Sequence, residues 1–234
     1  MKDKKKRRLN VGMGILMLAA GMLLASHTLA VAANDTQTAQ GIVDRARVTF
    51  QNFMNDPNYI WIHQNMDRAR GILIYPQVLK GGFIFGGSGG TGVLVVRDEK
   101  TGDWSQPAFY SIGSATVGLQ IGGEASQIIV MVMSQKAIDS LLTSSIKFGG
   151  DTSVALGPIG FGAKQNIIAD FVSFAKSQGL YAGINIEGSI VNVRDTLNSA
   201  YYGKYVTPVD ILIKNEVSNA GSNELRALLK KAVK

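Results

Sequence analysis

The chain has 234 residues, with 24 lysine and arginine residues against 17 aspartate and glutamate residues, and a formal net charge of +7 at pH 7. Six of the basic residues and one acidic residue lie in residues 1–32, so the remaining chain carries only +2 and its charge does not support nucleic-acid binding, which requires a clustered basic face. The chain contains no cysteine, which excludes disulfides, zinc–thiolate sites, cysteine nucleophiles and acylated-cysteine lipid anchors.

Residues 1–32 have the three-part layout of a secretory signal peptide. Six basic residues precede a mostly apolar run from Val11 to Ala25, and Ala30-Val31-Ala32 supplies the small–x–small pattern that a signal peptidase recognises. The apolar run of about 15 residues is shorter than the ~20 that cross a hydrocarbon core, so we expect cleavage after Ala32 rather than a retained anchor. Residues 33–234 then predict one domain, exported to the periplasm or secreted.

An amphipathic helix is predicted first, at about residues 36–54. Apolar residues recur there at spacings of three and four, polar residues occupy the other side of the helical wheel, and Pro57 follows the pattern. An apolar stripe of this kind is usually a surface that packs on a core. A second, short helix is predicted at Trp61–Ala69.

After Arg70 the chain is rich in glycine and in short β-branched runs, which predict strands. The predicted strands are Ile72–Tyr75, Phe83–Phe85, Thr91–Arg97, Phe109–Ile112, Thr116–Ile121, Gln127–Met133, Ser153–Leu156, Phe171–Ala175, Leu180–Glu187 and Ser189–Arg194. Further helices are predicted at Lys136–Ser144, Val209–Val217 and Glu224–Val233. The sequence therefore predicts the α+β class, with a strongly curved, mostly antiparallel, glycine-rich sheet or barrel and N- and C-terminal helices packed on it.

The glycine-rich run at residues 86–92 matches two catalytic patterns, and neither has its structural context. Gly87–Gly92 fits G-x-G-x-x-G, but Val93–Val96 follows as a predicted strand, where a dinucleotide site needs a helix. Residues 86–90 fit G-x-S-x-G around Ser88, but His63, the only histidine after residue 32, precedes it, which excludes the usual hydrolase order. We interpret Ser88 as part of a glycine-rich turn and His63 as structural.

Two carboxylates leave a catalytic alternative open. Glu124 and Glu187 lie in apolar, strand-rich surroundings, where a general acid–base pair is conceivable. We favour a structural role, in which each carboxylate accepts backbone hydrogen bonds in a turn. The sequence thus predicts a non-enzymatic protein with no catalytic residues, no cofactor and no metal site.

Five groups of segments follow one another along the chain: Arg70–Pro76 with Lys80–Phe83 and Gly86–Leu94, Trp104–Pro107 with Phe109, Gly118–Glu124, Ala155–Gly160, and Lys176–Gly183 with Glu187–Ser189, Arg194 and Tyr201–Gly203. In this order they resemble the SYLF domain family, the lipid-binding domain of eukaryotic actin-patch and endosomal adaptor proteins. The resemblance covers about residues 36–215 and includes nearly all of the predicted domain.

The resemblance implies phospholipid binding, with phosphoinositides as the usual eukaryotic ligand and with actin or its regulators as partners of some members. Export argues against actin as a partner here, and an envelope phospholipid is the expected ligand. The resemblance also implies that the N-terminal helix enters the membrane, through Ile42, Val43, Phe50 and Phe53. Packing of the same four residues in the core is the alternative.

Lipid binding further requires cations or N–H groups that meet phosphate. The candidates near glycines are Lys80, Lys164, Lys176, Arg194 and Lys204. Each is also explicable as a solvated surface charge. Two other functions stay open: a structural or protein-binding envelope component, and an outer-membrane barrel, whose strands of ~9–11 residues would exceed most of the predicted ones.

Overall fold

The computed structural model describes residues 34–82, 85–117, 122–160, 166–177 and 186–233, so the predicted signal peptide and Lys164 lie outside the described residues. An N-terminal helix (residues 34–54) is followed by η1 (Pro57–Tyr59), α2 (Ile60–Asn65) and η2 (Met66–Arg68). The strands and helices that follow are β1 (Gly71–Gly82), β2 (Phe85–Val96), β3 (Ala108–Val117), β4 (Gly122–Val132), α3 (Gln135–Leu141), β5 (Ser145–Lys147), β6 (Val154–Leu156), β7 (Phe171–Ser177), β8 (Ile190–Val193), α4 (Asp195–Tyr202), α5 (Pro208–Leu212), η4 (Ala220–Ser222) and α6 (Asn223–Ala232).

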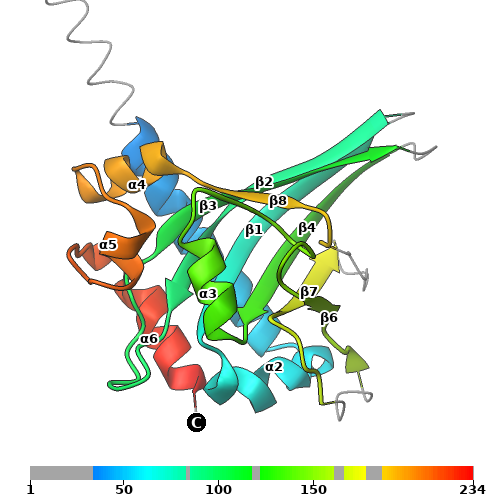
Figure 1. The fold of residues 1–234 in the computed structure, drawn as a ribbon, viewed down its shortest axis with the longest axis horizontal. Helices are drawn as coiled ribbons and strands as arrows, with labels where there is room; N and C mark the ends of the chain where they lie inside the picture. Colours follow the sequence, from blue (N-terminus) through cyan, green and yellow to red (C-terminus); the bar gives the residue numbers. More distant parts are fainter. Residues whose placement is uncertain (1–33, 83–84, 118–121, 161–165, 178–185, 234) are drawn as a thin grey trace, which may run out of the picture.

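The eight strands form one strongly curled sheet in the order β5-β8-β3-β2-β1-β4-β7-β6 (Figure 1). Every pair is antiparallel except β6 and β7, which run parallel. The sheet is a half-barrel with helices at both ends of the chain, which confirms the predicted α+β class and the mostly antiparallel pairing.

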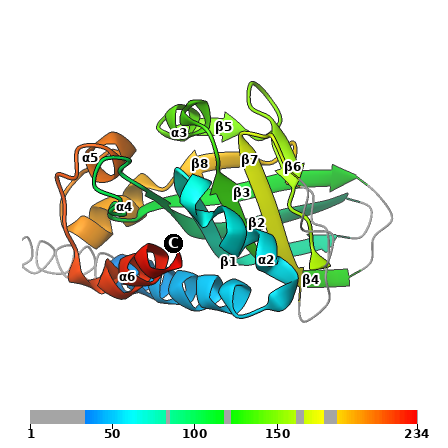
Figure 2. The ribbon, with the colours of Figure 1, turned by 90° about the horizontal axis from the view of Figure 1, so that it is seen from below.

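Both faces of the sheet are buried at its centre because successive side chains of a strand point to opposite sides. In β1, Ile72 and Ile74 belong to a core shared with the N-terminal helix, α2, α4 and α6. Leu73 and Tyr75 belong to a second core with α3 and α5. We call the two sides of the sheet the N-helix face and the α3 face; Figure 2 shows the sheet between the N-terminal helix and α3.

The central strands are longer than predicted, because their glycines lie within the ladder. Ser88 is paired in β2 with Ser114 of β3, so the prediction of a glycine-rich turn at Ser88 is wrong. β1 has a bulge between Ile74 and Val78, and a side chain at Gly90 or Gly92 would overlap its carbonyl oxygens. Glycine is therefore required where the bulge of β1 approaches the backbone of β2.

The predicted helices are present with changed ends. The predicted helix Trp61–Ala69 divides into α2 and η2. α5 ends at Leu212 rather than at Val217, and Asn215 beyond it has a positive φ of 54°, a conformation that interrupts a helix. Across the described ranges, no helix combines the length and the apolar character that crossing a membrane would need.

Candidate functional site

The apolar stripe of the N-terminal helix is part of the core. Ile42 and Val43 are buried, Phe50 and Phe53 are 0% exposed, and the ring of Phe53 lies 4.5 Å from that of Tyr59. In the structure these four residues therefore pack in the core, which is one of the two alternatives that the sequence leaves open. Membrane insertion through them would require the helix to leave the sheet.

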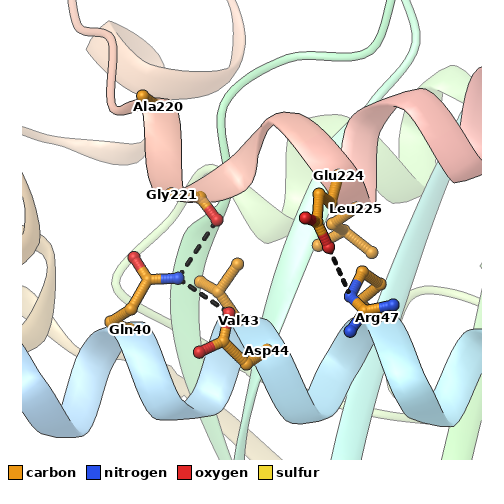
Figure 3. A pocket seen from close by; sticks show the side chains of 8 residues that line it. All are labelled: Gln40, Val43, Asp44, Arg47, Ala220, Gly221, Glu224 and Leu225. Carbon is orange, nitrogen blue, oxygen red and sulfur yellow. Dashed lines mark hydrogen bonds and ion pairs between the residues drawn. The ribbon is translucent and has the colours of Figure 1, made fainter.

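A small pocket of about 230 Å³ lies between the N-terminal helix and α6 (Figure 3). Its polar side chains bond to each other or to backbone: Arg47 Nε lies 3.2 Å from Glu224 Oε2, and Gln40 Nε2 donates to Asp44 Oδ1 at 2.8 Å and to Gly221 O at 3.1 Å. These contacts connect the first helix to the last and give the pocket a structural role.

The four described cations of the sequence prediction do not form one cluster. Lys80 lies in β1 opposite Glu124 of β4. It comes two residues after Val78, so both side chains are on the α3 face. Lys176 lies in β7 on the N-helix face, in register with Gln127 and two residues beyond buried Phe174. The remaining two belong to the other end of the sheet, where Arg194 begins α4 and Lys204 follows it.

Lys176 lines an open pocket of about 460 Å³ on the N-helix face. A second cation, Arg45, reaches the same pocket from the N-terminal helix, so two segments separated by 130 residues contribute one positive charge each. We call this the Arg45–Lys176 pocket. The other lining residues are Pro76, Gln77, Ala125, Ser126 and Gln127.

Asp56 holds the ammonium group of Lys176. Lys176 Nζ lies 2.8 Å from Asp56 Oδ2, while Asp56 Oδ1 accepts hydrogen bonds from the backbone N–H of Asn58 at 3.1 Å and from Asn58 Nδ2 at 2.9 Å. Partial burial acts to raise the pKa of Asp56, but the hydrogen bonds from Lys176 and Asn58 outweigh it and hold this pKa below its ordinary value. Asp56 is therefore ionised at neutral pH.

An exposed apolar side chain accompanies this pocket. Leu79 of β1 is 56% exposed and pairs in register with Ala125, one of the residues that line the pocket. Leu79 comes after the bulge, in the part of β1 where glycine becomes frequent. Cationic and apolar surface are thus neighbours at this end of the sheet, which is the combination that an anionic amphiphile needs.

The sequence analysis names Lys176 as a candidate and does not name Arg45 or Asp56. Arg45 lies on the polar side of the helix, where a charge is expected to be solvated, and Asp56 is the N-cap of η1. The ion pair of Asp56 with Lys176 and the pocket that Arg45 shares with Lys176 form only in the folded chain.

The residues of the catalytic alternatives make the following contacts within the described ranges. Ser88 Oγ lies 2.8 Å from Ser114 Oγ. Glu124 lies in β4 and accepts a hydrogen bond from Ser177 Oγ, so the prediction that it accepts backbone hydrogen bonds in a turn is wrong. His63 Nε2 contacts the backbone oxygen of Met54. In the part of the chain that the structure describes, no three acidic or histidine side chains are grouped closely enough to hold a metal ion.

Comparison with known proteins agrees with the SYLF resemblance. The chain matches the Ysc84 family, described as Las17-binding protein actin regulator, over residues 113–232. It is 33% identical over 171 residues to an SH3 domain-containing protein of Schizosaccharomyces pombe, covering 70% of this chain and 39% of that protein. It is 34% identical over 154 residues to LAS seventeen-binding protein 3 of Saccharomyces cerevisiae, covering 63% and 33%.

The human SH3 domain-containing YSC84-like protein 1 is 29% identical over 180 residues, which are 75% of this chain and 52% of the human protein. The chain thus spans a third to about half of the length of the curated relatives described here. The names of the family and of these relatives refer to binding partners, modules and regulators rather than to reactions. The matches confirm the resemblance drawn from the sequence, and the chain belongs to the Ysc84 (SYLF) family.

Proposed function

We propose that this protein is a non-enzymatic binder of anionic phospholipid, and that the Arg45–Lys176 pocket receives the headgroup phosphate. The observation that carries the proposal is that Arg45 and Lys176, from distant segments of the chain, line one open pocket beside the exposed side chain of Leu79. A basic side chain near an anionic lipid surface contributes about 1 kcal/mol, and an apolar residue beside it adds contact with the acyl region.

The proposed contact does not need the N-terminal helix to leave the sheet. Arg45 is exposed on the helix while Phe50 and Phe53 stay in the core, so one helix both packs the fold and presents a cation. Membership of the SYLF family supports a phospholipid as the ligand. We also propose, from the basic and apolar pattern of residues 1–32, that the protein is exported, so an envelope phospholipid is its ligand.

Protein binding is the second candidate function, because the family is described by Las17 binding and actin regulation. A different part of this chain favours it. Tyr205 is 74% exposed and lines an open groove between the start of the N-terminal helix and α4. A test of the purified protein with lipid vesicles and no protein partner separates the two candidates. A lipid-binding protein binds such vesicles, whereas a domain that binds only proteins does not.

The experiment is co-sedimentation with vesicles of phosphatidylcholine, with and without phosphatidylglycerol. We expect the wild type to bind the anionic vesicles, and Arg45→Ala and Lys176→Ala each to weaken this binding about fivefold, because one cation near the surface contributes about 1 kcal/mol. Leu79→Asp should weaken it as well. Each variant should keep the thermal midpoint of the wild type to within a few degrees.

Lys230→Ala is the matched control. Lys230 is exposed on α6 and pairs with Asp103 at 2.6 Å, away from the pocket, so its loss removes the same charge from another part of the surface. Undiminished vesicle binding by the double variant Arg45→Ala, Lys176→Ala would contradict the proposal. An equal loss of binding in Lys230→Ala would show that binding depends on the net charge of the protein and not on this pocket.

A further inference from the structure

We infer that Gln77 and Gln127 make the Arg45–Lys176 pocket selective for a phospholipid whose headgroup carries hydroxyl groups, as a glycerol headgroup does. Both glutamines line the pocket together with the two cations. On the proposed function, on which this inference rests, the cations bind the phosphate. The two amide side chains bind the group that is attached to the phosphate, and so they determine which headgroups the pocket accepts.

The bulge of β1 places Gln77 opposite Gln127. The pairing of β1 with β4 shifts between Tyr75 and Val78, so Pro76 and Gln77 together lie opposite Gln127 alone. An extra residue of this kind bends the strand and redirects its side chains. Proline suits such a position, because it has no backbone N–H to donate to a ladder. The bulge thus brings the two amide side chains to neighbouring positions in the wall of the pocket.

Lys176 continues the same row on the next strand. β1, β4 and β7 are consecutive in the sheet, and Lys176 of β7 is in register with Gln127 of β4 (Figure 1). Residues directly opposite each other in antiparallel strands have Cβ atoms about 4.5–5.5 Å apart, and these two lie on the N-helix face. A phosphate held by Lys176 and Arg45 therefore has its substituent beside the glutamines.

The two amide groups are available to a ligand. Gln77 is exposed and Gln127 is partly buried, and the structure gives neither side chain a hydrogen bond to another residue of the described ranges. By contrast, Ser126 in the same pocket is engaged with Ser177, with the two Oγ atoms 2.5 Å apart. An amide has both donors and an acceptor, and a hydroxyl group likewise donates and accepts. Because the amide is uncharged, it distinguishes headgroups by their hydrogen-bonding groups and not by their charge.

The experiment compares two phosphodiester lipids of the same charge. Vesicles of phosphatidylcholine contain the same fraction of either phosphatidylglycerol, whose headgroup has free hydroxyl groups, or phosphatidylethanol, whose headgroup has none. One net hydrogen bond between uncharged groups raises affinity by a factor of about three at the weak end of the usual range. With one bond to each glutamine, we expect the wild type to bind phosphatidylglycerol vesicles about ninefold more tightly than phosphatidylethanol vesicles.

The variants Gln77→Met and Gln127→Met remove each amide and keep a side chain of similar length. Each should lower the ratio between the two lipids about threefold, and the double variant should bring it close to one, with the thermal midpoint within a few degrees of the wild type. Arg45→Ala should weaken binding of both lipids equally and leave the ratio unchanged. Gln37→Met is the matched control, since Gln37 is exposed near the start of the N-terminal helix and does not line the pocket.

The outcomes separate this inference from the proposed function. Equal binding of the two lipids by the wild type, or an undiminished ratio in the double variant, overturns the inference and leaves lipid binding standing. A ratio that falls as much in Gln37→Met also overturns it. Soluble glycerophosphoglycerol distinguishes the source of the ligand: its binding without any binding of vesicles supports the hydroxyl-selective site and overturns lipid as the source. Failure of the wild type to bind either kind of vesicle or the soluble probe overturns both proposals.

Discussion

The two ends of the central strands differ in how they are held. At the helix-covered end, Ile72–Tyr75, Val93–Val96 and Ile128–Val132 are buried on both faces by apolar cores. At the glycine-rich end, beyond the bulge of β1, the same strands carry glycine, serine and partly exposed residues such as Leu79 and Lys80. Side-chain burial stabilises the first end, and close backbone packing shapes the second, where side chains remain accessible to a ligand.

The largest expected effect comes from charging the covered end. Phe50→Asp with Phe53→Asp places two carboxylates where both side chains are 0% exposed, against a core of aromatic and aliphatic residues. Burying an unpaired carboxylate costs several kcal/mol, and a domain of this size has about 5–15 kcal/mol in total, so we expect the fold to be lost. Circular dichroism and the thermal midpoint without lipid measure this.

The same variant decides the role of the N-terminal helix in membranes. If the helix rests outside the core in solution and inserts through Ile42, Val43, Phe50 and Phe53, the midpoint would stay unchanged and vesicle binding alone would fall. Arg45→Asp is the matched control, because it places a carboxylate on the exposed side of the same helix. It should leave the midpoint within a few degrees and weaken anionic vesicle binding.

The boundary between the two ends is the bulge of β1, and glycine substitutions test it. A Cβ at Gly92 would overlap the backbone oxygen of Ile74, while a Cβ at Gly89 has the oxygen of Ile112 at an ordinary 3.7 Å. We expect Gly92→Ala to cost about 1–3 kcal/mol of unfolding free energy, as overpacking does, and Gly89→Ala to be neutral or slightly stabilising. Urea denaturation of both variants gives the comparison, and equal losses would show that glycine is needed for flexibility rather than for space.

The covered end was predictable from the sequence, and the glycine-rich end only in part. Short apolar and β-branched runs predicted Ile72–Tyr75, which is part of β1, and Gln127–Met133, which is part of β4, because strands that are buried on both faces are continuously apolar. Beyond the bulge the strands have no such apolar run, so the sequence predicts that this strand ends at Tyr75 and that the glycine-rich residues around Ser88 form a turn. Pairing between strands extends them there, and pairing has no signature in a single strand.

The candidate site shows the same limit. Lys176 was identified by its place beside a glycine-rich segment, but its two electrostatic neighbours are known only from tertiary contact. Arg45 belongs to a helix whose pattern predicts core packing on the other side, and Asp56 precedes Pro57, where a capping role accounts for it. A local sequence pattern accounts for the presence of each residue separately. The charge of the pocket depends on the contacts that bring these residues together in the folded chain.

The smallest expected effect concerns the edge of the sheet, where hydrogen bonds replace a core. Asp170 accepts hydrogen bonds from Ser134 Oγ, at the start of α3, and from the backbone N–H and Oγ of Ser153 at 2.8 and 3.0 Å, just before β6. The hydrogen bonds from Ser134 and Ser153 hold the pKa of Asp170 below its ordinary value of 3.8.

Because the folded pKa of Asp170 is depressed, its contribution to stability is complete above pH 3.8 and is lost as the pH falls through the folded pKa. Asp170→Asn should therefore cost about 1–2 kcal/mol at pH 7, the value of one or two hydrogen bonds to a charged group, and progressively less as the pH falls below 3.8. Urea denaturation at pH 7, 4 and 2.5 measures the difference, with Asp103→Asn as an exposed control. A difference that stays constant across this range would mean that the shape of the side chain, and not its charge, connects β6 to α3.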